Sequence, residues 1–232
     1  MTNIAVILAG GSGTRVGGDI PKQFQRLADG RTVLETCVEV FEQNDRIDGI
    51  LIVVPMDYLE QAKILCQKNR YGKILGFVPG GSERWQSSWK ALDELHRQLP
   101  ADGRNDCNVL LHDCARPFVS QRIVTDVVQA LVAHEAVTVA VPVTDTIYLT
   151  DSHRLTAIPN RASVLRAQTP QAFRLSLIRK AFENALAEGN ILATDDVGIV
   201  HQYMPEQSIF IVQGEEQNRK ITYKEDLERI GQ

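Results

Sequence analysis

A short apolar run that ends in a cluster of glycines stands near the start of the chain. Residues 4–9 read Ile-Ala-Val-Ile-Leu-Ala, and glycines dominate residues 10–18. An apolar, β-branched run of this length is too short for a buried helix and predicts a central parallel strand that opens into a tight loop. Because α/β sheets bind their ligands at the carboxyl ends of such strands, this loop is the first candidate for a binding site.

Strand-like and helix-like segments alternate along the rest of the chain. Strands are expected at 50–54, 73–78, 107–112, 136–143 and 208–212, and helices at 33–41, 58–68, 83–99, 120–133, 175–188 and 223–230. Short connections between such segments imply parallel strands joined by right-handed crossovers. We therefore expect the 232 residues to form a single α/β domain, 1–232, with a Rossmann-like, mostly parallel sheet flanked by helices.

The segment 144–161 does not follow this pattern. It is polar and rich in turn residues, contains Pro159 and lacks a strong apolar period. Such a segment is expected to form a projecting β-arm, and an arm that cannot bury its own surface commonly packs on a second subunit. A mobile surface hairpin is the alternative to this dimerisation arm.

Charge and composition exclude several classes of partner. The formal net charge is -4, whereas a nucleic-acid-binding surface needs many clustered cations. The sequence shows no signal peptide and no apolar run of membrane-spanning length, so we expect a cytoplasmic protein with no membrane partner. The cysteines lack metal-type spacing and are expected to be reduced thiols in or near the core: Cys37, Cys66, Cys107 and Cys114.

The glycine-rich loop predicts a site for a phosphorylated ligand. Glycine has no Cβ, so the backbone N–H groups of the loop can approach an anion closely. Arg15 and Lys22 add positive charges beside the loop, which suits a polyphosphate better than a neutral ligand. The loop lacks the Gly-Lys-Ser/Thr end of a P-loop, and the third glycine of the dinucleotide fingerprint is displaced. A plain sharp turn is the alternative.

The run from Leu8 to Phe24 resembles the nucleotide-binding signature of sugar-phosphate nucleotidyltransferases, and Pro21-Lys22-Gln23-Phe24 is similar to the branch that uses CTP and polyol phosphates. This polyol-phosphate cytidylyltransferase family includes ribitol-5-phosphate cytidylyltransferase and 2-C-methyl-D-erythritol 4-phosphate cytidylyltransferase. Later motifs extend the resemblance over nearly the whole chain. The resemblance implies an enzyme that transfers CMP from CTP to a polyol phosphate, with Mg²⁺ as cofactor, and that forms a homodimer through the arm.

On this resemblance, CTP is bound by the glycine-rich loop, by the loop that precedes the helix at 83–99 and by the end of the strand at 107–112. Ser82 or Ser87 could otherwise simply cap that helix. The CTP-binding residues implied are Leu8, Ala9, Gly10, Gly11, Ser12, Gly13, Thr14, Arg15, Lys22, Gly80, Gly81, Ser87, Asp113 and Cys114.

Asp113 ends an apolar strand, in the run Leu-Leu-His-Asp-Cys-Ala-Arg-Pro-Phe at 110–118. A carboxylate at this edge of a sheet can bridge a hard cation to phosphate oxygens, so Asp113 is the predicted Mg²⁺ ligand. An ion pair with Arg116 that braces the turn is the alternative. His112 is expected to be packed rather than catalytic, and Cys114 to be a small wall residue rather than a nucleophile.

The resemblance also implies residues that hold the acceptor. Two of them, Thr146 and Arg161, belong to the arm and are expected to reach the substrate of the neighbouring subunit, where an arginine fork suits a phosphate. Without the resemblance, Thr194 would be a helix N-cap and Lys220 a solvated lysine beside Glu225. The acceptor-binding residues implied are Asp113, Thr146, Arg161, Thr169, Thr194 and Lys220, and the catalytic residues are Arg15, Lys22 and Lys220.

Departures from the family pattern bear on the acceptor. Gln217 stands where methylerythritol-phosphate enzymes often have an aspartate, which leaves a second carboxylate on the metal open. The runs at 9–11, Ala-Gly-Gly, and at 158–162, Ile-Pro-Asn-Arg-Ala, resemble the ribitol-phosphate branch, whereas Thr-Asp-Asp at 194–196 resembles the methylerythritol branch. We therefore expect D-ribitol 5-phosphate as the acceptor and CDP-ribitol as the product. The alternative is 2-C-methyl-D-erythritol 4-phosphate, an isoprenoid precursor.

Two other classes of protein stay open. A non-catalytic nucleotide-binding protein could share the fold, although it would have no need to keep Arg15, Lys22 and Asp113 together. A nicotinamide-dependent oxidoreductase is disfavoured by the broken glycine spacing.

Overall fold

The computed structural model describes residues 1–11, 20–100, 103–104, 107–223 and 226. Within these residues a seven-stranded sheet has the order β3-β2-β1-β4-β8-β5-β9. Its strands are β1 (Thr2–Leu8), β2 (Gly49–Val54), β3 (Ile74–Pro79), β4 (Cys107–Asp113), β5 (Ala136–Pro142), β8 (Leu165–Arg174) and β9 (Phe210–Gln213). The neighbouring pairs β1–β2, β1–β4, β2–β3 and β5–β9 are parallel, and β8 runs antiparallel to both β4 and β5. The prediction of a mostly parallel sheet is confirmed.

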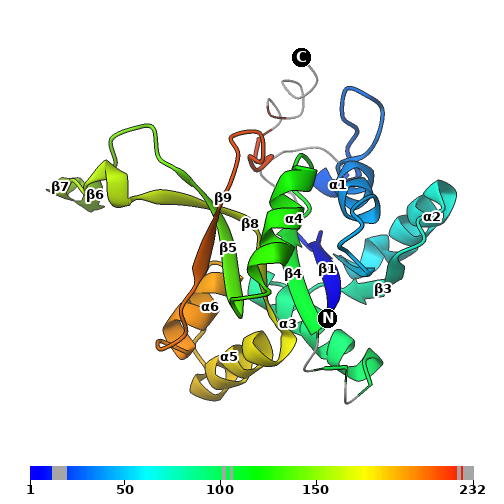
Figure 1. Ribbon diagram of the computed structural model, residues 1–232. Coiled ribbons are helices and arrows are strands. Elements are labelled where there is room, and N and C mark those ends of the chain that lie inside the picture. Colours follow the sequence, from blue (N-terminus) through cyan, green and yellow to red (C-terminus); the bar gives the residue numbers. More distant parts are fainter. Residues whose placement is uncertain (12–19, 101–102, 105–106, 224–225, 227–232) are drawn as a thin grey trace.

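Helices cover both faces of this sheet (Figure 1). On one face, α1 (Val33–Glu42), α2 (Leu59–Asn69) and α4 (Gln121–Ala130) share a core with alternate strand residues such as Ala5 and Ile7. On the other face, α3 (Arg84–Gln98), α5 (Leu175–Glu188) and α6 (Asp196–Tyr203) pack on Ile4, Val6 and Leu8. Since both faces of β1 are covered, its continuous apolar run is the pattern that a central strand requires.

Local signals set several helix ends. The Thr32 side chain accepts a hydrogen bond from the N–H of Glu35, and the Glu35 carboxylate accepts one from the N–H of Thr32, so a capping box begins α1. Gly189 has a φ of 78° and ends α5 in the left-handed conformation, as its place after the predicted helix indicates. Thr194 is not the cap of α6, because Asp195 holds that position and accepts from the N–H of Gly198.

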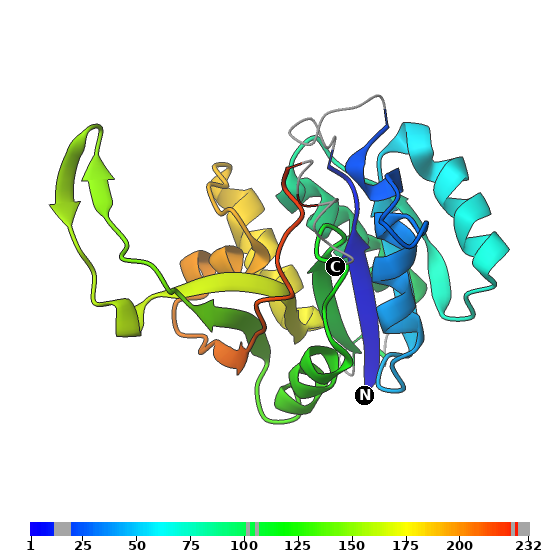
Figure 2. The ribbon, with the colours of Figure 1, turned by 90° about the horizontal axis from the view of Figure 1, so that it is seen from above.

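The arm is a separate two-stranded hairpin of β6 (Leu149–Asp151) and β7 (Arg154–Ala157). Figures 1 and 2 both show it extending away from the rest of the chain. Every residue of the two strands is exposed, including Leu149 and Leu155. The hairpin lies inside the segment 144–161 that the sequence marks as a projecting arm.

The main difference from the predicted elements is β8. Its residues 168–171 read Gln-Thr-Pro-Gln and lack an apolar alternation, so the sequence pattern did not indicate a strand there. Residues 168–173 of this strand are buried between β4 and β5 because their polar side chains find partners, as the hydrogen bonds of Gln168 and Gln171 show. The helix expected at 223–230 falls largely outside the described residues. No helix among the described residues is long and apolar enough to cross a membrane.

Candidate active site

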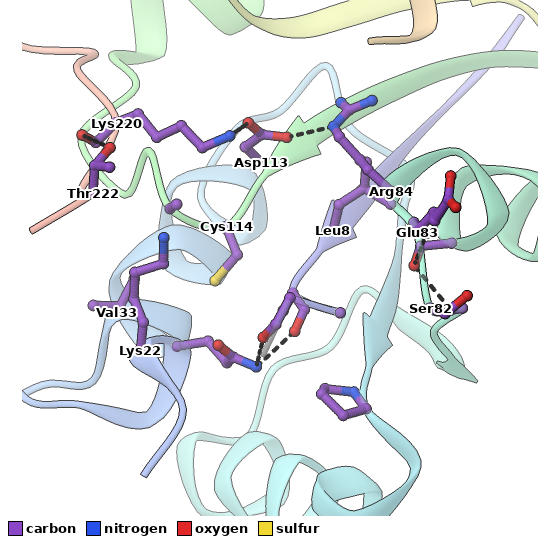
Figure 3. A pocket seen from close by; sticks show the side chains of 18 of the residues that line it. Leu8, Lys22, Val33, Ser82, Glu83, Arg84, Asp113, Cys114, Lys220 and Thr222 are labelled. Atoms are coloured by element: carbon purple, nitrogen blue, oxygen red, sulfur yellow. Dashed lines mark hydrogen bonds and ion pairs between the residues drawn. The ribbon is translucent and has the colours of Figure 1, made fainter. Parts of the chain in front are cut away.

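A pocket of about 600 Å³ opens at the carboxyl ends of β1 and β4. Loops that follow β2 and β3, the start of α3 and the segment at 220–222 complete its wall (Figure 3). The lining residues are Leu8, Ala9, Gly10, Gly11, Lys22, Gln23, Val33, Pro55, Gly81, Ser82, Glu83, Arg84, Ser87, Asp113, Cys114, Ala115, Thr194, Lys220 and Thr222. The pocket therefore lies where parallel sheets place their ligands, and its size suits a nucleotide.

Hydrogen bonds from the Gln23 side chain hold the described part of the glycine-rich loop in place. Its side-chain Nε2 donates to the carbonyl oxygens of Ala9, at 2.8 Å, and of Gly11, at 3.2 Å. Gln23 is buried and belongs to η1 (Lys22–Phe24), the short helix that also carries Lys22. The same short helix therefore fixes the loop backbone and places a lysine at the pocket.

The loop before α3 approaches the glycine-rich loop closely. A Cβ on Gly10 would lie 3.0 Å from Oγ of Ser87 and 3.6 Å from Cα of Gly80. The Ser87 hydroxyl accepts a hydrogen bond from the N–H of Gly81 at 3.0 Å. A side chain at Gly10 or Gly80 would thus press on the contact between the two loops, and Ser87 orders the second loop from within the pocket wall.

Two lysines reach the pocket from distant parts of the chain. Nζ of Lys22 donates to the carbonyl oxygen of Ile221 at 2.8 Å, and Nζ of Lys220 lies 2.8 Å from Oδ2 of Asp113. The segment 218–222 is fixed by Asn218, which is fully buried and donates to the carbonyl oxygen of Thr169 at 2.8 Å. Lys220 is therefore ion-paired at the pocket, although its side chain is 39% exposed.

Asp113 lies between two cations in the pocket, as Figure 3 shows. Its Oδ1 is 3.1 Å from Nε of Arg84, and its Oδ2 pairs with Lys220. Burial alone would raise the pKa of the Asp113 carboxyl, but the charges of Arg84 and Lys220 outweigh burial and hold the pKa below its ordinary value. The carboxylate is therefore ionised at neutral pH.

Arg116 does not form the ion pair with Asp113 that the sequence left open. Its guanidinium donates to the carbonyl oxygens of Asn218, at 2.9 Å, and of Ala167, at 3.2 Å. Arg116 therefore ties the loop after β4 to β8 and to the segment that carries Lys220.

His112 is packed, as predicted, and it orders the residues behind Asp113. The ring is fully buried, and burial lowers its pKa to about 4, so it is neutral near pH 7. The Thr169 hydroxyl accepts from the N–H of Asp113 at 3.1 Å and lies 3.0 Å from Nδ1 of His112. Because Nε2 of His112 faces the carbonyl oxygen of Arg116 at 3.0 Å, Nε2 carries the proton and Nδ1 accepts from Thr169.

The four cysteines are free and buried, as expected. The N–H of Cys114 donates to the carbonyl oxygen of Leu8 at 3.1 Å, so this residue joins the ends of β4 and β1. Burial raises the pKa of the Cys37 thiol, which hydrogen-bonds to Cys114. Cys114 is a wall residue of the pocket in this arrangement.

The structure brings most of the predicted site residues together. Eleven of them line the pocket, namely Leu8, Ala9, Gly10, Gly11, Lys22, Gly81, Ser87, Asp113, Cys114, Thr194 and Lys220. Four others are not among the lining residues: Gly80 lies beside Gly10, Thr169 lies behind Asp113, and Thr146 and Arg161 are exposed on the arm. The predicted residues Ser12, Gly13, Thr14 and Arg15 lie outside the described residues.

Arg84 and Gln23 are functional candidates that sequence reasoning did not assign. Arg84 follows the glycine-serine run before α3, and Gln23 belongs to the Pro-Lys-Gln-Phe run. Neither run indicates which of its side chains points into the pocket. Among the described residues there is no cluster of three or more His, Cys, Asp or Glu side chains that could hold a metal by itself. Any metal in this pocket would depend on phosphate oxygens for most of its ligands.

The fold is that of the α/β nucleotidyltransferases. The family model of 2-C-methyl-D-erythritol 4-phosphate cytidylyltransferase matches residues 3–231. The chain belongs to this family of polyol-phosphate cytidylyltransferases, which confirms the resemblance found in the sequence.

Two relatives illustrate the range of the family. A 2-C-methyl-D-erythritol 4-phosphate cytidylyltransferase of Thermobifida fusca is 43% identical over 228 residues, which cover 96% of this chain and 89% of the relative. A bifunctional ribulose 5-phosphate reductase/CDP-ribitol pyrophosphorylase of Haemophilus influenzae is 35% identical over 227 residues, which cover 97% of this chain and 46% of that relative. Both branches that the sequence analysis considered are therefore represented.

A solved structure agrees with the fold. The crystal structure of 4-diphosphocytidyl-2C-methyl-D-erythritol synthase from Anaerococcus prevotii is 31% identical, with a TM-score of 0.83 over 97% of this chain and 92% of that one. The α/β fold of this chain therefore agrees with that of a solved structure over nearly its whole length.

Proposed function

We propose that this chain transfers CMP from CTP to 2-C-methyl-D-erythritol 4-phosphate and releases pyrophosphate. The observation that carries the proposal is the pocket in which Asp113, Lys220 and Lys22 meet at the carboxyl ends of β1 and β4. The choice of acceptor is supported by the family model and by 43% identity to the Thermobifida fusca enzyme. These comparisons favour the methylerythritol alternative over the ribitol phosphate that the sequence departures favoured.

The proposed reaction builds up negative charge that the site must stabilise. A phosphate oxygen of the acceptor attacks the α-phosphorus of CTP in line, the bond to the bridging oxygen breaks, and pyrophosphate leaves with the electron pair. The acceptor phosphate is already ionised near neutral pH, so no general base is needed. Negative charge increases on the α-phosphate and on the leaving group, and fixed cations stabilise it in the transition state.

Lys22 and Lys220 are the described cations suited to this task. Lys22 stands beside the glycine-rich loop, where it can stabilise the triphosphate, and Lys220 follows in the adjoining segment beside Asp113. Both contact protein oxygens, so a bound phosphate oxygen could replace those oxygens with little movement of either side chain. Arg15 is proposed as a third cation of the triphosphate site and lies outside the described residues.

The residues present fit a Mg²⁺ ion that a triphosphate carries into the pocket. Asp113 offers one ionised carboxylate, and its oxygens are held by ion pairs that a bound cation would compete with. Mg²⁺ commonly binds through one or two carboxylates together with substrate phosphates. When bound, the ion would neutralise charge on the phosphate oxygens and increase the reactivity of the α-phosphorus.

The acceptor is proposed to bind beside Lys220 and Thr194, which both line the pocket and are exposed. Arg161 and Thr146 of the arm are exposed, and Nη1 of Arg161 donates to the carbonyl oxygen of Thr144 at 3.0 Å. An arm that projects from its own chain could supply these groups to a second copy. We therefore propose a homodimer in which each arm completes the partner's acceptor site.

Ribitol 5-phosphate is the second candidate acceptor. The Haemophilus influenzae relative carries CDP-ribitol pyrophosphorylase in its name, and the chain matches it at 35% identity. The two acceptors differ in their hydroxyl and methyl groups. A pocket that hydrogen-bonds the hydroxyl groups of one acceptor leaves some of its own buried polar groups unpaired when the other acceptor binds.

The test is pyrophosphate release from CTP with Mg²⁺, with each acceptor at the same subsaturating concentration and with Lys22→Ala as the inactive control. Faster release with methylerythritol phosphate supports the proposal, and faster release with ribitol phosphate selects the second candidate. Release no faster than that of Lys22→Ala with either acceptor rejects both.

The dimer is tested separately by light scattering after gel filtration. A mass of two chains supports the exchanged arm, and Leu155→Asp on the exposed face of the arm should then reduce the mass to that of one chain. A single-chain mass for the wild type would remove the partner role of Thr146 and Arg161.

A further inference from the structure

Arg84 lies between two carboxylates that come from different parts of the fold. Its Nε is 3.1 Å from Oδ1 of Asp113 at the end of β4, and its Nη1 is 2.8 Å from Oδ2 of Asp196. Arg84 is the first residue of α3, and Asp196 is the first residue of α6. The guanidinium therefore joins three elements at the floor of the pocket, as Figure 3 shows for its contact with Asp113.

Burial increases the energetic cost of breaking the ion pair between Arg84 and Asp196. Asp196 is fully buried, and the side chains of Arg84 and Asp113 are 26% and 11% exposed. Within the described residues, Asp196 forms an ion pair with Arg84 alone. A buried carboxylate that loses its counterion is strongly destabilising, so Asp196 holds Arg84 in place as much as Arg84 neutralises Asp196.

The planar fork of arginine sets the direction of the Asp113 carboxylate. With Nη1 paired to Asp196, the planar guanidinium presents Nε to Asp113, whose Oδ1 accepts a hydrogen bond from it at 3.1 Å. Oδ2 is then turned toward Lys220 in the pocket. Lysine could supply the same charge at position 84, but a single ammonium group lacks the two diverging donors.

We propose that Arg84, held by Asp196, is a positioning residue that orients Asp113 and links the start of α3 to the acceptor side of the pocket. The link to the acceptor side runs through α6, because Asp196 stands two positions after the pocket residue Thr194. The proposal rests on the proposed function. It assigns Arg84 no contact with the reacting atoms.

A purely structural ion pair is the competing explanation, and a double-variant cycle separates the two. The variants are Arg84→Gln, Asp196→Asn and the combination of both, with Arg97→Gln on the exposed side of the same helix as the matched control. Arg84→Gln leaves a buried, unpaired carboxylate and should lower the urea midpoint. Adding Asp196→Asn removes that carboxylate and should restore most of the midpoint.

Turnover is expected to respond differently. Arg84→Gln should lower kcat by about 10- to 100-fold, which is the usual effect of losing a group that orients an active-site ligand. The double variant should remain as slow as Arg84→Gln although its midpoint recovers, because Oδ1 of Asp113 still lacks its arginine partner. Asp196→Asn alone should lower kcat less, since Arg84 still pairs with Asp113, and Arg84→Lys should restore the urea midpoint better than kcat.

Equilibrium binding gives a readout apart from turnover. The chain has two tryptophans, Trp85 and Trp89, and both lie on α3, so their fluorescence should report CTP binding. The Kd for CTP should change by no more than about threefold in the Arg84 variants, because their defect is in kcat rather than in ground-state binding.

Recovery of kcat together with the midpoint in the double variant would overturn the proposal, and so would a wild-type kcat in Arg84→Gln. If Arg84→Gln does not fold, the double variant carries the test alone, and a wild-type kcat in it is the overturning result. If the wild-type enzyme releases no pyrophosphate with either acceptor, the proposed function is rejected, and the positioning role with it. If the wild type is active and the double variant is equally active, only the positioning role is rejected.

Discussion

Nζ of Lys220 lies 2.8 Å from Oδ2 of Asp113, although 107 positions separate the two residues in the sequence. The contact joins the end of the central strand β4 to a segment near the end of the described chain. It places a cation and an anion side by side in the pocket where a triphosphate and an acceptor phosphate are proposed to meet.

Lys22→Ala is expected to abolish most of the turnover and to leave the fold intact. Removal of one preorganised charge donor typically costs on the order of 10²-fold or more in rate. Lys22 lies at the pocket in a short 3₁₀ helix, and the loop below it is held by Gln23 rather than by Lys22. Pyrophosphate release and far-UV circular dichroism check this, and near-normal turnover would contradict the role.

Asn218→Ala is expected to impair both stability and turnover. Asn218 is buried, and its Nδ2 donates to the carbonyl oxygen of Thr169 at 2.8 Å and to Oε1 of Gln168 at 3.2 Å. Loss of these bonds leaves buried acceptors unpaired, at about 1–3 kcal/mol of unfolding free energy. Because the same segment carries Lys220, the kcat measured at saturating substrates should fall as well. Gln217→Ala, at an exposed neighbouring position, is the control and should change neither quantity appreciably.

Gly10→Ala is expected to raise the KM for CTP and to destabilise the fold. The new Cβ would lie 3.0 Å from Oγ of Ser87, which must then shift and release the N–H of Gly81. The matched control for stability is Gly11→Ala, because a Cβ there meets nothing within 4 Å. Urea melts of the two variants should therefore differ, with the lower midpoint for Gly10→Ala, and equal midpoints would show that the loops tolerate the contact.

Acid is expected to weaken the fold through His112. Its pKa is about 4 in the folded protein and 6.5 in a model peptide, so the unfolded chain binds the proton more readily. The stability from the neutral ring is present above pH 6.5 and is lost as the pH falls toward 4, which amounts to about 3 kcal/mol at 1.36 kcal/mol per pKa unit.

Urea unfolding of the metal-free protein between pH 7.5 and 4.5 measures this loss. In His112→Asn, the fall in unfolding free energy should be shallower than in the wild type. His153→Gln, on the exposed arm, should keep the wild-type slope. An unchanged slope in His112→Asn would assign the acid sensitivity to other groups.

Most of the fold could be predicted because its signals are local. The apolar run of β1, the capping residues of α1 and Gly189 after α5 each involve a few neighbouring positions. β8 could not be predicted in this way, since its glutamines resemble a loop until their partners are known. The Gln171 side chain accepts from the N–H groups of Asp196 and Val197, which lie at the start of α6.

Some residues of the candidate site could also be predicted from local signals, and others could not. The glycine-rich loop, Lys22 and Asp113 were found from motifs that record a local backbone or charge requirement, and Lys220 was found from the family resemblance. Arg84 was not assigned, since as a sequence it is only an arginine at the start of a helix. Local sequence alone would make Thr194 the N-cap of α6, but Asp195 holds that position, because adjacent Thr and Asp residues are both good caps until the backbone angles decide between them.

The sequence by itself determined the class of this protein, because glycine, lysine and aspartate at the ends of apolar strands are what a phosphate-binding α/β sheet requires. The tertiary structure decided which charges meet. Asp113 faces Arg84 and Lys220 rather than the neighbouring Arg116, whose guanidinium is drawn to the carbonyl oxygens of Asn218 and Ala167. Ion pairs depend on distance in space, and only the packing of α3, α6 and the segment at 218–222 around β4 brings these groups within reach.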